Sequence, residues 1–367
     1  MKIKNFLMFF LIFSTLNFSA CNNSNYGNIN NNEMSYLPNS SIYTMATPTR
    51  FNDFFLELFN TLSIVIGYAD SQEEFDYYRN IIYNELYRLH MLFDIYNEYP
   101  GINNIYTINK NAGIAPVEVD PEIIELIKIS KEAYNITNGV FNIALGSVLS
   151  IWHTHRNAEN PTLPSMESLL IANEFTNIND IIIDEENSTI FLRYENMSLD
   201  VGSIGKGFAI ELAVGRAREA GFESFLLNVG GDVLTANGPP ERGFWNVGVE
   251  SPDHSLNAQS VVDVVLADNL AVFVSGDYQR FFVIDGVAYS HIINPKTLMP
   301  AYNFRSVTVL HSSAVYSEII SLAAFIMDLD DGLELMARYD AEALWILNDG
   351  QIFTSPGYVN FSRDLVN

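Results

Sequence analysis

The chain of 367 residues contains a single cysteine, Cys21. One cysteine cannot form a disulfide within the chain, and its position near the N-terminus excludes a cysteine nucleophile or cysteine-based zinc site in the rest of the chain. Basic residues are also scarce, because 19 Lys and Arg stand against 44 Asp and Glu, for a net charge of −25. Such an acidic chain does not attract nucleic acid by charge, so no nucleic-acid partner is expected.

No apolar run reaches the roughly 20 residues that a membrane-spanning helix needs. The N-terminus has two lysines in its first four residues, an apolar run over residues 6–13, and Ser19-Ala20 before Cys21, which is typical of a secretory signal. The position of Cys21 resembles that of the lipidated cysteine in a bacterial lipobox. We therefore expect residues 1–20 to be a lipoprotein signal peptide and the protein to be an exported lipoprotein on the extracytoplasmic face of the cell membrane. A plain secretory signal is the alternative.

Residues 21–50 are rich in Asn and Ser and show no apolar periodicity. This composition predicts a flexible tether, with an r.m.s. reach of about 30 Å. Hydrophobic residues make up 48% of the whole chain, which is enough for a sizeable core. We expect the folded domain to span residues 51–367.

Helix and strand patterns both recur in this domain. A capping box from Ser71 to Glu74 and the pair Asp120-Pro121 are typical helix starts. The further expected elements are helices over 206–220 and 317–327, strands over 62–66, 225–229, 245–249 and 261–266, and hairpins over 181–192 and 343–353. This mixture predicts the α+β class, as a single large domain of mixed helices and antiparallel-rich sheet.

The segment from Ser275 to Pro295 combines a polar turn with a histidine. Ser275–Tyr278 (SGDY) predicts a turn between an apolar run and a strand over 281–284. Asp285-Gly286 is typical of a hairpin turn, which returns a strand over 289–293 beside the first one. The sequence therefore places His291 of the returning strand close to the turn that contains Asp277.

Two glycine-rich segments are candidates for ligand binding. In Asp200–Gly207 (DVGSIGKG), free backbone groups and Lys206 at a helix start suit a phosphate, although an ordinary strand-to-helix connection has the same features. In Asn228–Asp232 (NVGGD), paired glycines allow a ligand to approach closely and Asp232 could bind a hydroxyl or metal. Taken alone, a sharp turn explains the second segment equally simply.

The remaining candidates are weaker. His153 and His155 lack a third ligand at a suitable spacing, so we expect both in a loop. Glu318 is expected in the first turn of an apolar helix, where an acidic residue ordinarily complements the helix dipole. His291 on its own could equally be a structural histidine.

Taken in order, these segments resemble the ApbE-type FAD:protein FMN transferase family. The resemblance is carried by Asn104–Gly113, Gly139–Ile143, Trp152, DVGSIGKG, NVGGD, Trp245–Pro252, SGDYQR, HIINP and the helix at Glu318. It implies an α+β fold with an FAD cleft. It also implies an Mg²⁺-dependent enzyme that transfers FMN from FAD to a Thr or Ser hydroxyl of a partner flavoprotein, through a phosphoester bond, and releases AMP.

The resemblance also implies roles for individual residues. His291 would be the base that accepts the hydroxyl proton, with Asn294 beside it in the same motif. The positions implied to contact FAD are Gly205, Lys206, Gly207, Gly230, Gly231, Asp232, Ser275, Gly276, Asp277, Tyr278 and Arg280. The positions implied to hold the metal are the Gly205 carbonyl and Glu318. Ser321 is a further candidate ligand, because it lies three residues after Glu318 and so near the same helix face.

Several positions depart from the family pattern. Asn142 and Asn294 stand where the family has Asp, Leu298 where it has Gly, and Leu322 where it has a metal-binding Thr, while Glu318 replaces a shorter Asp. Loss of an oxygen ligand at Leu322 predicts weaker metal binding, which Ser321 could partly offset. We expect Asn294 to orient His291 by a hydrogen bond but not to stabilise it by charge. Two alternatives to transfer follow: an Mg²⁺-dependent FAD pyrophosphatase that yields FMN and AMP, or an inactive flavin-binding lipoprotein.

Overall fold

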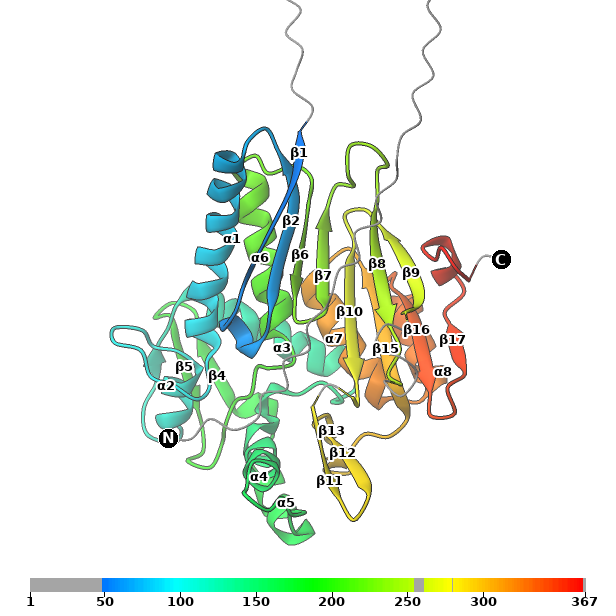
Figure 1. The fold of residues 1–367 in the computed structure, drawn as a ribbon. Coiled ribbons are helices and arrows are strands. Elements are labelled where there is room, and N and C mark those ends of the chain that lie inside the picture. The colour runs from blue at the N-terminus through cyan, green and yellow to red at the C-terminus, as the bar shows by residue number, and fades with distance from the viewer. Residues whose placement is uncertain (1–47, 254–260, 279, 366–367) are drawn as a thin grey trace, which may run out of the picture. The chain divides into compact units, whose positions relative to one another are not determined.

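The computed structural model describes residues 48–253, 261–278 and 280–365, so the predicted signal segment, Cys21 and the tether up to residue 47 lie outside them. The predicted end of the tether at residue 50 is wrong, because strand β1 begins at Thr49. An antiparallel sheet runs through the centre of the described chain (Figure 1). Every neighbouring pair of its strands is antiparallel. In spatial order the eight strands are β1 (Thr49–Phe55), β2 (Ser63–Ala69), β6 (Phe225–Val229), β7 (Asp232–Ala236), β10 (Ala271–Gly276), β15 (Phe304–His311), β16 (Glu342–Leu347) and β17 (Ile352–Thr354).

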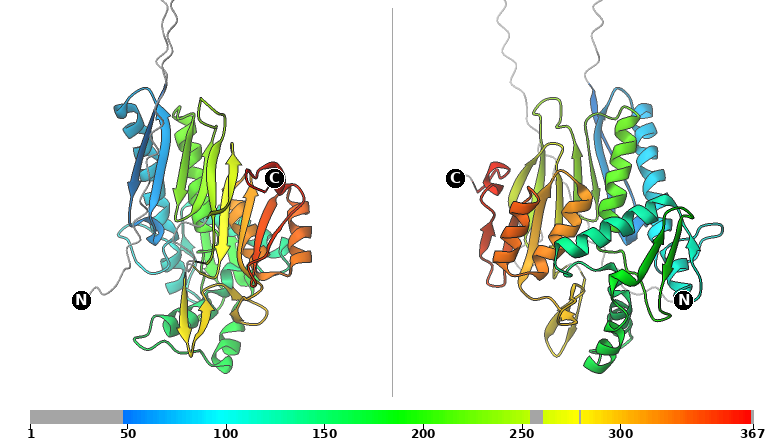
Figure 2. Two further views of the ribbon diagram at one scale, coloured as in Figure 1. Left: turned by 45° about the vertical axis from the view of Figure 1, so that its right-hand side comes forward. Right: turned by 180° about the vertical axis from the view of Figure 1, so that it is seen from behind.

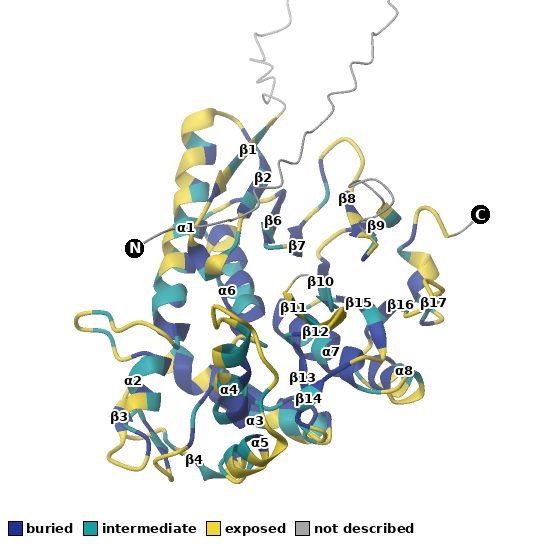
Figure 3. Ribbon diagram, turned by 60° about the horizontal axis from the view of Figure 1, so that its bottom comes forward, coloured by how far each residue is buried: buried dark blue, intermediate teal, exposed yellow. Residues whose placement is uncertain are grey.

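Four helices cover one face of this sheet, as the rear view in Figure 2 shows. They are α1 (Gln72–Phe93), α6 (Gly205–Glu219), α7 (Ala314–Ile326) and α8 (Leu329–Arg338). Side chains cap three of them, because Ser71, Ser313 and Asp328 accept hydrogen bonds from the first turns of α1, α7 and α8. The α7 helix is buried along nearly its whole length (Figure 3), which matches its apolar sequence.

A two-stranded ribbon packs on the opposite face. Its strands, β8 (Trp245–Glu250) and β9 (Val261–Ala267), pair antiparallel. Residues of β8 alternate between buried and exposed, so one side of the ribbon joins a core with β6, β7 and β10. The domain therefore has three layers: helices, sheet and ribbon.

Smaller elements gather at one end of the sheet, the lower end in Figure 1. The hairpin of β11 (Phe281–Ile284) and β12 (Val287–Ser290) extends there beside α4 (Gly146–Arg156) and α5 (Met166–Asn173). The other elements are α2 (Ile105–Lys110), α3 (Pro121–Ile136), β3 (Val117–Glu118), β4 (Ile181–Asp184), β5 (Thr189–Leu192), β13 (Ile293–Asn294), β14 (Met299–Pro300), and short 3-10 helices at Leu58–Asn60, Ile143–Leu145, Ile178–Asp180 and Tyr358–Asn360.

The predicted α+β class is confirmed, and most predicted elements are present with shifted ends. The strand expected over 62–66 is β2, which continues to Ala69, and the helix expected over 317–327 begins earlier, at Ala314. The prediction of a loop at His153 and His155 is wrong, because both lie in α4. In the described part of the chain, no helix is long and apolar enough to cross a membrane.

Candidate active site

Lys206 and Asp232 form an ion pair where the start of α6 meets the β6–β7 turn. Asp232 is buried and also accepts a hydrogen bond of 3.2 Å from the backbone N–H of Val274 in β10. Burial alone would lower the pKa of the Lys206 ammonium, but the negative charges of Asp232 and Glu318 outweigh burial and raise this pKa. Lys206 therefore keeps its charge, and that charge is balanced inside the protein.

Glu318 approaches the same point from α7. Its Oε2 accepts a hydrogen bond of 2.7 Å from the backbone N–H of Gly207. Burial raises the pKa of the Glu318 carboxyl to about 8, although Lys206 acts in the opposite direction. The expectation that Glu318 lies in the first helical turn is wrong, because α7 begins at Ala314 and the carboxyl lies inside the protein. Complementing the helix dipole therefore does not explain Glu318.

Gly207 is required by this close approach. A Cβ atom at position 207 would lie 2.5 Å from the Ala314 carbonyl oxygen and 3.0 Å from Oε2 of Glu318. Gly205 differs, because a Cβ there would make only ordinary contacts with Phe93, at 3.6 Å or more. The glycine at 207 therefore serves the packing of α6 against α7.

Two hydroxyl groups continue this polar cluster. Ser321 Oγ donates to the Glu318 carbonyl at 3.0 Å and lies 3.0 Å from Ser275 Oγ, which β10 supplies. The neighbouring Leu322 is partly buried and packs against two hydrophobic cores. Leu322, which stands where the family has a metal-binding Thr, thus contributes apolar packing instead of a hydroxyl.

The donor atoms of this cluster fit a hard divalent cation. Within the described residues, no three His, Cys, Asp or Glu side chains gather as metal ligands. The carboxylates of Asp232 and Glu318 and the hydroxyls of Ser275 and Ser321 are nevertheless all oxygen donors, which Mg²⁺ prefers. Because Mg²⁺ normally keeps several waters, one buried carboxylate with a hydroxyl and a carbonyl is a sufficient protein contribution.

His291 follows β12 directly, so the prediction that a strand carries it is wrong by one residue. The predicted hairpin turn is confirmed, because β11 and β12 pair antiparallel on either side of Asp285 and Gly286, which have positive φ of 50° and 81°. The His291 backbone N–H donates to the Arg280 carbonyl at 3.1 Å, and His291 Nδ1 lies 3.0 Å from the same oxygen. A carbonyl only accepts, so Nδ1 carries the proton and Nε2 holds the free lone pair.

The surroundings of His291 are positively charged. Burial, followed by the cations of Arg280 and Arg156, lowers the pKa of His291 to about 4. The imidazole is therefore neutral at physiological pH and can accept a proton at Nε2. The free lone pair on Nε2 suits a general base, and the lowered pKa makes it a weaker base than an ordinary histidine.

Asn294 does not orient His291, contrary to our expectation. Its Oδ1 accepts a hydrogen bond of 2.9 Å from the Lys296 backbone N–H, and its carbonyl accepts one of 2.8 Å from Leu298. Asn294 therefore closes its own turn. The Arg280 carbonyl holds His291 in its place, and sequence spacing gave no signal of this.

Asp277 also has a partner within the protein. Arg305 Nε donates to its two carboxylate oxygens, at 2.9 and 3.2 Å, and Arg305 also binds the Pro252 carbonyl at 3.2 Å. A Cβ at Gly276 would lie 2.6 Å from the ring of Tyr278. The turn after β10 is thus held by side-chain contacts of its own, and Arg280 follows it toward His291.

The glycine pair before Asp232 packs against another loop. Gly230 donates to the Leu62 carbonyl at 2.9 Å, and a Cβ at this position would lie 2.4 Å from Thr61 Oγ1. Gly230 and Gly231 have φ of 67° and 100°, which favour glycine. The turn conformation therefore explains both glycines, and Asp232 is the member of the segment that reaches Lys206.

Two residues of this neighbourhood, Tyr96 and Arg156, escaped the sequence analysis. His153 Nδ1 lies 3.4 Å from the Tyr96 hydroxyl, and both residues interact electrostatically with Asp200, Arg156 and Arg280. The available signal was the buried residues Val148 and Trp152, which lie four apart and so define a helix face. Recognising that helix would have placed Arg156 one turn beyond Trp152.

Two departures from the family pattern have local explanations. The Asn142 amide donates to the Thr176 carbonyl at 2.9 Å, while its oxygen accepts from the Ala144 N–H at 2.9 Å. An aspartate could not make the first bond. Leu298 has a φ of 60°, yet its side chain is buried and its carbonyl accepts the Trp152 indole N–H at 3.0 Å.

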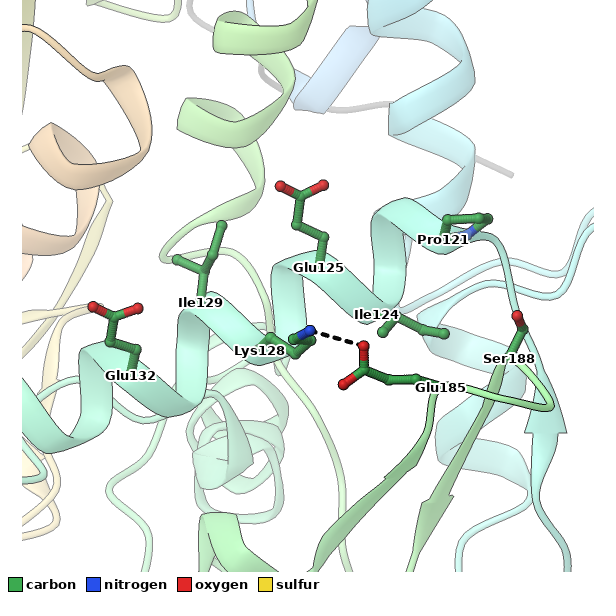
Figure 4. A pocket seen from close by; sticks show the side chains of 8 residues that line it. All are labelled: Pro121, Ile124, Glu125, Lys128, Ile129, Glu132, Glu185 and Ser188. Carbon is green, nitrogen blue, oxygen red and sulfur yellow. Dashed lines mark hydrogen bonds and ion pairs between the residues drawn. The ribbon is translucent and has the colours of Figure 1, made fainter.

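A separate cavity of about 650 Å³ lies between α3 and the β4–β5 connection (Figure 4). Its lining contains Glu125, Glu132 and Glu185, with Lys128 paired to Glu185 at 2.8 Å. None of the candidate site residues described in this section lines this cavity. The chemistry-bearing groups of the chain therefore lie elsewhere, around Lys206 and His291.

Comparison with other proteins gives a consistent picture. A model of the ApbE family matches residues 60–345. A protein named FAD:protein FMN transferase from Klebsiella pneumoniae (strain 342) is 28% identical over 267 residues, which cover 71% of this chain and 80% of that protein. One of the same name from Treponema pallidum (strain Nichols) is 28% identical over 272 residues, which cover 70% and 74%.

Solved structures agree with the fold. The crystal structure of the ApbE protein from Thermotoga maritima superposes with a TM-score of 0.76 at 27% identity, over 86% of this chain and all of that one. The flavin transferase ApbE from Vibrio cholerae gives a TM-score of 0.72 at 21% identity, over 85% of this chain. The second likeness concerns the fold alone.

Proposed function

The chain belongs to the ApbE family, and from this premise we propose that it transfers FMN from FAD to a Thr or Ser hydroxyl of a partner flavoprotein. The observation that carries the proposal is the state of His291. Its Nδ1 is fixed by the Arg280 carbonyl, which leaves Nε2 to accept a proton. The buried cluster of Lys206, Asp232 and Glu318 supplies a second polar centre.

The proposed step is a displacement at the FMN phosphorus of FAD. His291 Nε2 takes the proton of the acceptor hydroxyl as its oxygen attacks that phosphorus. A phosphoester bond forms, the pyrophosphate bond to AMP breaks, and AMP leaves with the bridging oxygen and its electron pair. The flavin phosphate ends on the acceptor side chain, so atoms and charge are conserved.

Mg²⁺, when bound, would neutralise charge on the phosphates. Glu318 and Ser321 would hold it, with the Gly205 carbonyl as a further ligand. The raised pKa of the Glu318 carboxyl supports this role, because a cation can replace the proton that burial favours. The backbone N–H of Gly207 holds one carboxylate oxygen of Glu318 in place.

We further propose that the protein is an exported lipoprotein, anchored through Cys21 and tethered by the segment between Cys21 and β1. The sequence pattern around Cys21 supports this location. The acceptor would then be a flavoprotein domain on the same face of the membrane. Replacement of Cys21 by Ala should release the protein from the membrane fraction, and incorporation of labelled palmitate should be lost with it.

Mass spectrometry of the products tests the transfer. Purified protein is incubated with FAD and Mg²⁺, either with a peptide that carries one Thr or with a matched peptide that carries Val there. Covalent FMN on the Thr peptide alone, with equimolar AMP, supports the proposal.

The other outcomes separate the alternatives. AMP and free FMN without any peptide would establish a pyrophosphatase, in which water replaces the hydroxyl. Bound FAD without AMP, under Mg²⁺ or Mn²⁺, would overturn catalysis and leave a flavin-binding protein. The same reaction in EDTA measures the dependence on metal.

A further inference from the structure

Two arginines near His291 have no carboxylate partner. Arg156 is the last residue of α4, and Arg280 immediately precedes β11. Within the described residues, neither forms an ion pair, whereas Arg79, Arg88 and Arg305 all do. Other arginines of the described chain, among them Arg338, also lack an ion pair. Arg156 and Arg280 differ from Arg338 because both act on His291.

The packing of α4 on the hairpin brings these arginines together. Trp152 of α4 donates its indole N–H to the Leu298 carbonyl at 3.0 Å, and its ring lies 6.3 Å from that of Phe282 in β11. Arg156 follows Trp152 by one helical turn and so shares the helix face that meets the hairpin. Arg280 lies two residues before Phe282, and its carbonyl holds His291.

Electrostatics agree with this placement. Besides burial, each arginine lowers the pKa of His291, and Arg280 lowers that of Arg156. Asp200 is the carboxylate in this neighbourhood, but its Oδ1 accepts the Gly202 N–H at 2.9 Å and it pairs with neither arginine. Asp200 acts through space on His153 and Arg156, so it offsets part of the positive charge beside His291 without an ion pair to either arginine.

Lys206 is the residue that the family resemblance implies for phosphate binding. Unlike Arg156 and Arg280, it has a carboxylate partner. Its ammonium is paired with Asp232 and is also within the field of Glu318. A phosphate would have to compete with the Asp232 carboxylate for this ammonium. The cations near His291 that lack an ion pair in the described chain are Arg156 and Arg280 instead.

We propose that Arg156 and Arg280 together bind the pyrophosphate of FAD, as a guanidinium clamp separate from Lys206 and from the metal. This inference rests on the proposed function. Each planar guanidinium can donate two parallel hydrogen bonds to phosphate oxygens, and both phosphates of FAD are anionic. A bound pyrophosphate would also offset the repulsion between the two like charges. The clamp would hold the FMN phosphorus next to Nε2 of His291.

The test is FAD binding without divalent metal, in EDTA, followed by flavin fluorescence. The variants are Arg156→Gln, Arg280→Gln, the double variant, and Arg338→Gln, an exposed and unpaired arginine of α8, as the matched control. We expect each single variant to raise the Kd for FAD about 10-fold and the double variant up to about 100-fold. Riboflavin, which lacks phosphate, should bind all variants alike.

Further readouts separate a clamp from a structural role. Arg156→Lys and Arg280→Lys should keep only part of the affinity for FAD that the Gln variants lose, since a point charge lacks the fork geometry of a guanidinium group. The salt dependence of the FAD Kd should weaken in the double variant. Thermal unfolding of each variant identifies any loss of fold.

Two results would overturn the clamp alone. One is an unchanged FAD Kd in the folded double variant, which would leave Arg156 as a complement to the α4 dipole. The other is an unchanged FAD Kd with a raised KM for the acceptor peptide, which would assign the arginines to a carboxylate of the acceptor. Failure of the wild-type protein to bind FAD would overturn the proposed function as well.

Discussion

The backbone N–H of Gly207 donates to the buried carboxylate of Glu318 at 2.7 Å and so links the first turn of α6 to α7. The link has no room for a side chain, because a Cβ at 207 would lie 2.5 Å from the Ala314 carbonyl. It fixes one oxygen of Glu318 next to Lys206. Any cation that binds Glu318 must therefore do so at a carboxylate that is already positioned.

Replacing Glu318 with Gln should stabilise the metal-free protein at alkaline pH. Burial raises the pKa of Glu318 to about 8, whereas its value in an unfolded chain is near 4.5. Stability from the protonated carboxyl is thus fully present below pH 4.5 and is lost as pH rises through 8. Gln stays neutral and still accepts the Gly207 N–H. We therefore expect the free energy of unfolding of Glu318→Gln to exceed that of the wild type by about 1–3 kcal/mol at pH 8.5.

Urea unfolding in EDTA at pH 5 and pH 8.5 measures this effect. Glu334→Gln, at an exposed position of α8, is the control and should change stability at neither pH. In the presence of Mg²⁺, Glu318→Gln should lose transfer activity and the stabilisation that the metal gives the wild type. A variant that is less stable than the wild type at pH 8.5 in EDTA would contradict the buried, protonated state.

Restoring the family's carboxylate at position 294 should have little effect. Asn294 Oδ1 accepts from the Lys296 N–H, and an aspartate can do the same. We expect Asn294→Asp to keep the transfer rate within about 3-fold, whereas Asn294→Ala should lose about 1 kcal/mol of stability with the turn bond. Rates and thermal unfolding of the two variants separate these effects, and a more than 10-fold gain in Asn294→Asp would place a carboxylate on His291 after all.

The elements with local signals could be predicted from the sequence. Asp285-Gly286 fixed the hairpin because both residues adopt positive φ, and this placed His291 beside the 275–280 segment. The caps at Ser71 and Asp120 likewise gave the starts of α1 and α3. In each case the information lies within about four residues of the feature.

The partners of the site residues could not be predicted in this way. Gly207 and Glu318 are separated by 111 positions, and Lys206 and Asp232 by 26. Motif order implied that such residues share one site, but it could not show that Lys206 is neutralised. Arg156 lies outside every quoted motif, and only the packing of Trp152 on the hairpin reveals where it points.

Introducing the family's hydroxyl at position 322 should improve metal binding at a cost in stability. Leu322 packs against both large cores, so Leu322→Thr loses apolar contacts worth about 1–3 kcal/mol. Leu322→Val has nearly the shape of Thr without its hydroxyl and is the matched control. We expect the Mg²⁺ concentration for half-maximal transfer to be several-fold lower for Leu322→Thr than for Leu322→Val. Both variants should lose similar thermal stability. Equal Mg²⁺ dependence in the two would remove position 322 from the metal site.

The pH dependence of transfer should lack the acid limb of an ordinary histidine. Because burial and two arginines lower the pKa of His291 to about 4, its base form persists well below pH 6.5. Since kcat/KM reports the free enzyme, we expect it to fall on the acid side only near pH 4 to 5.

His291→Asn should lower kcat by about 10²- to 10⁴-fold with the FAD Kd within about 3-fold, while His155→Asn, at an α4 histidine bonded to Thr162, should change neither. Loss of the Arg280 cation should raise the pKa of His291, so the acid limb should move to higher pH in Arg280→Gln. An acid limb at pH 6.5 in the wild type that stays there in Arg280→Gln would contradict the lowered pKa.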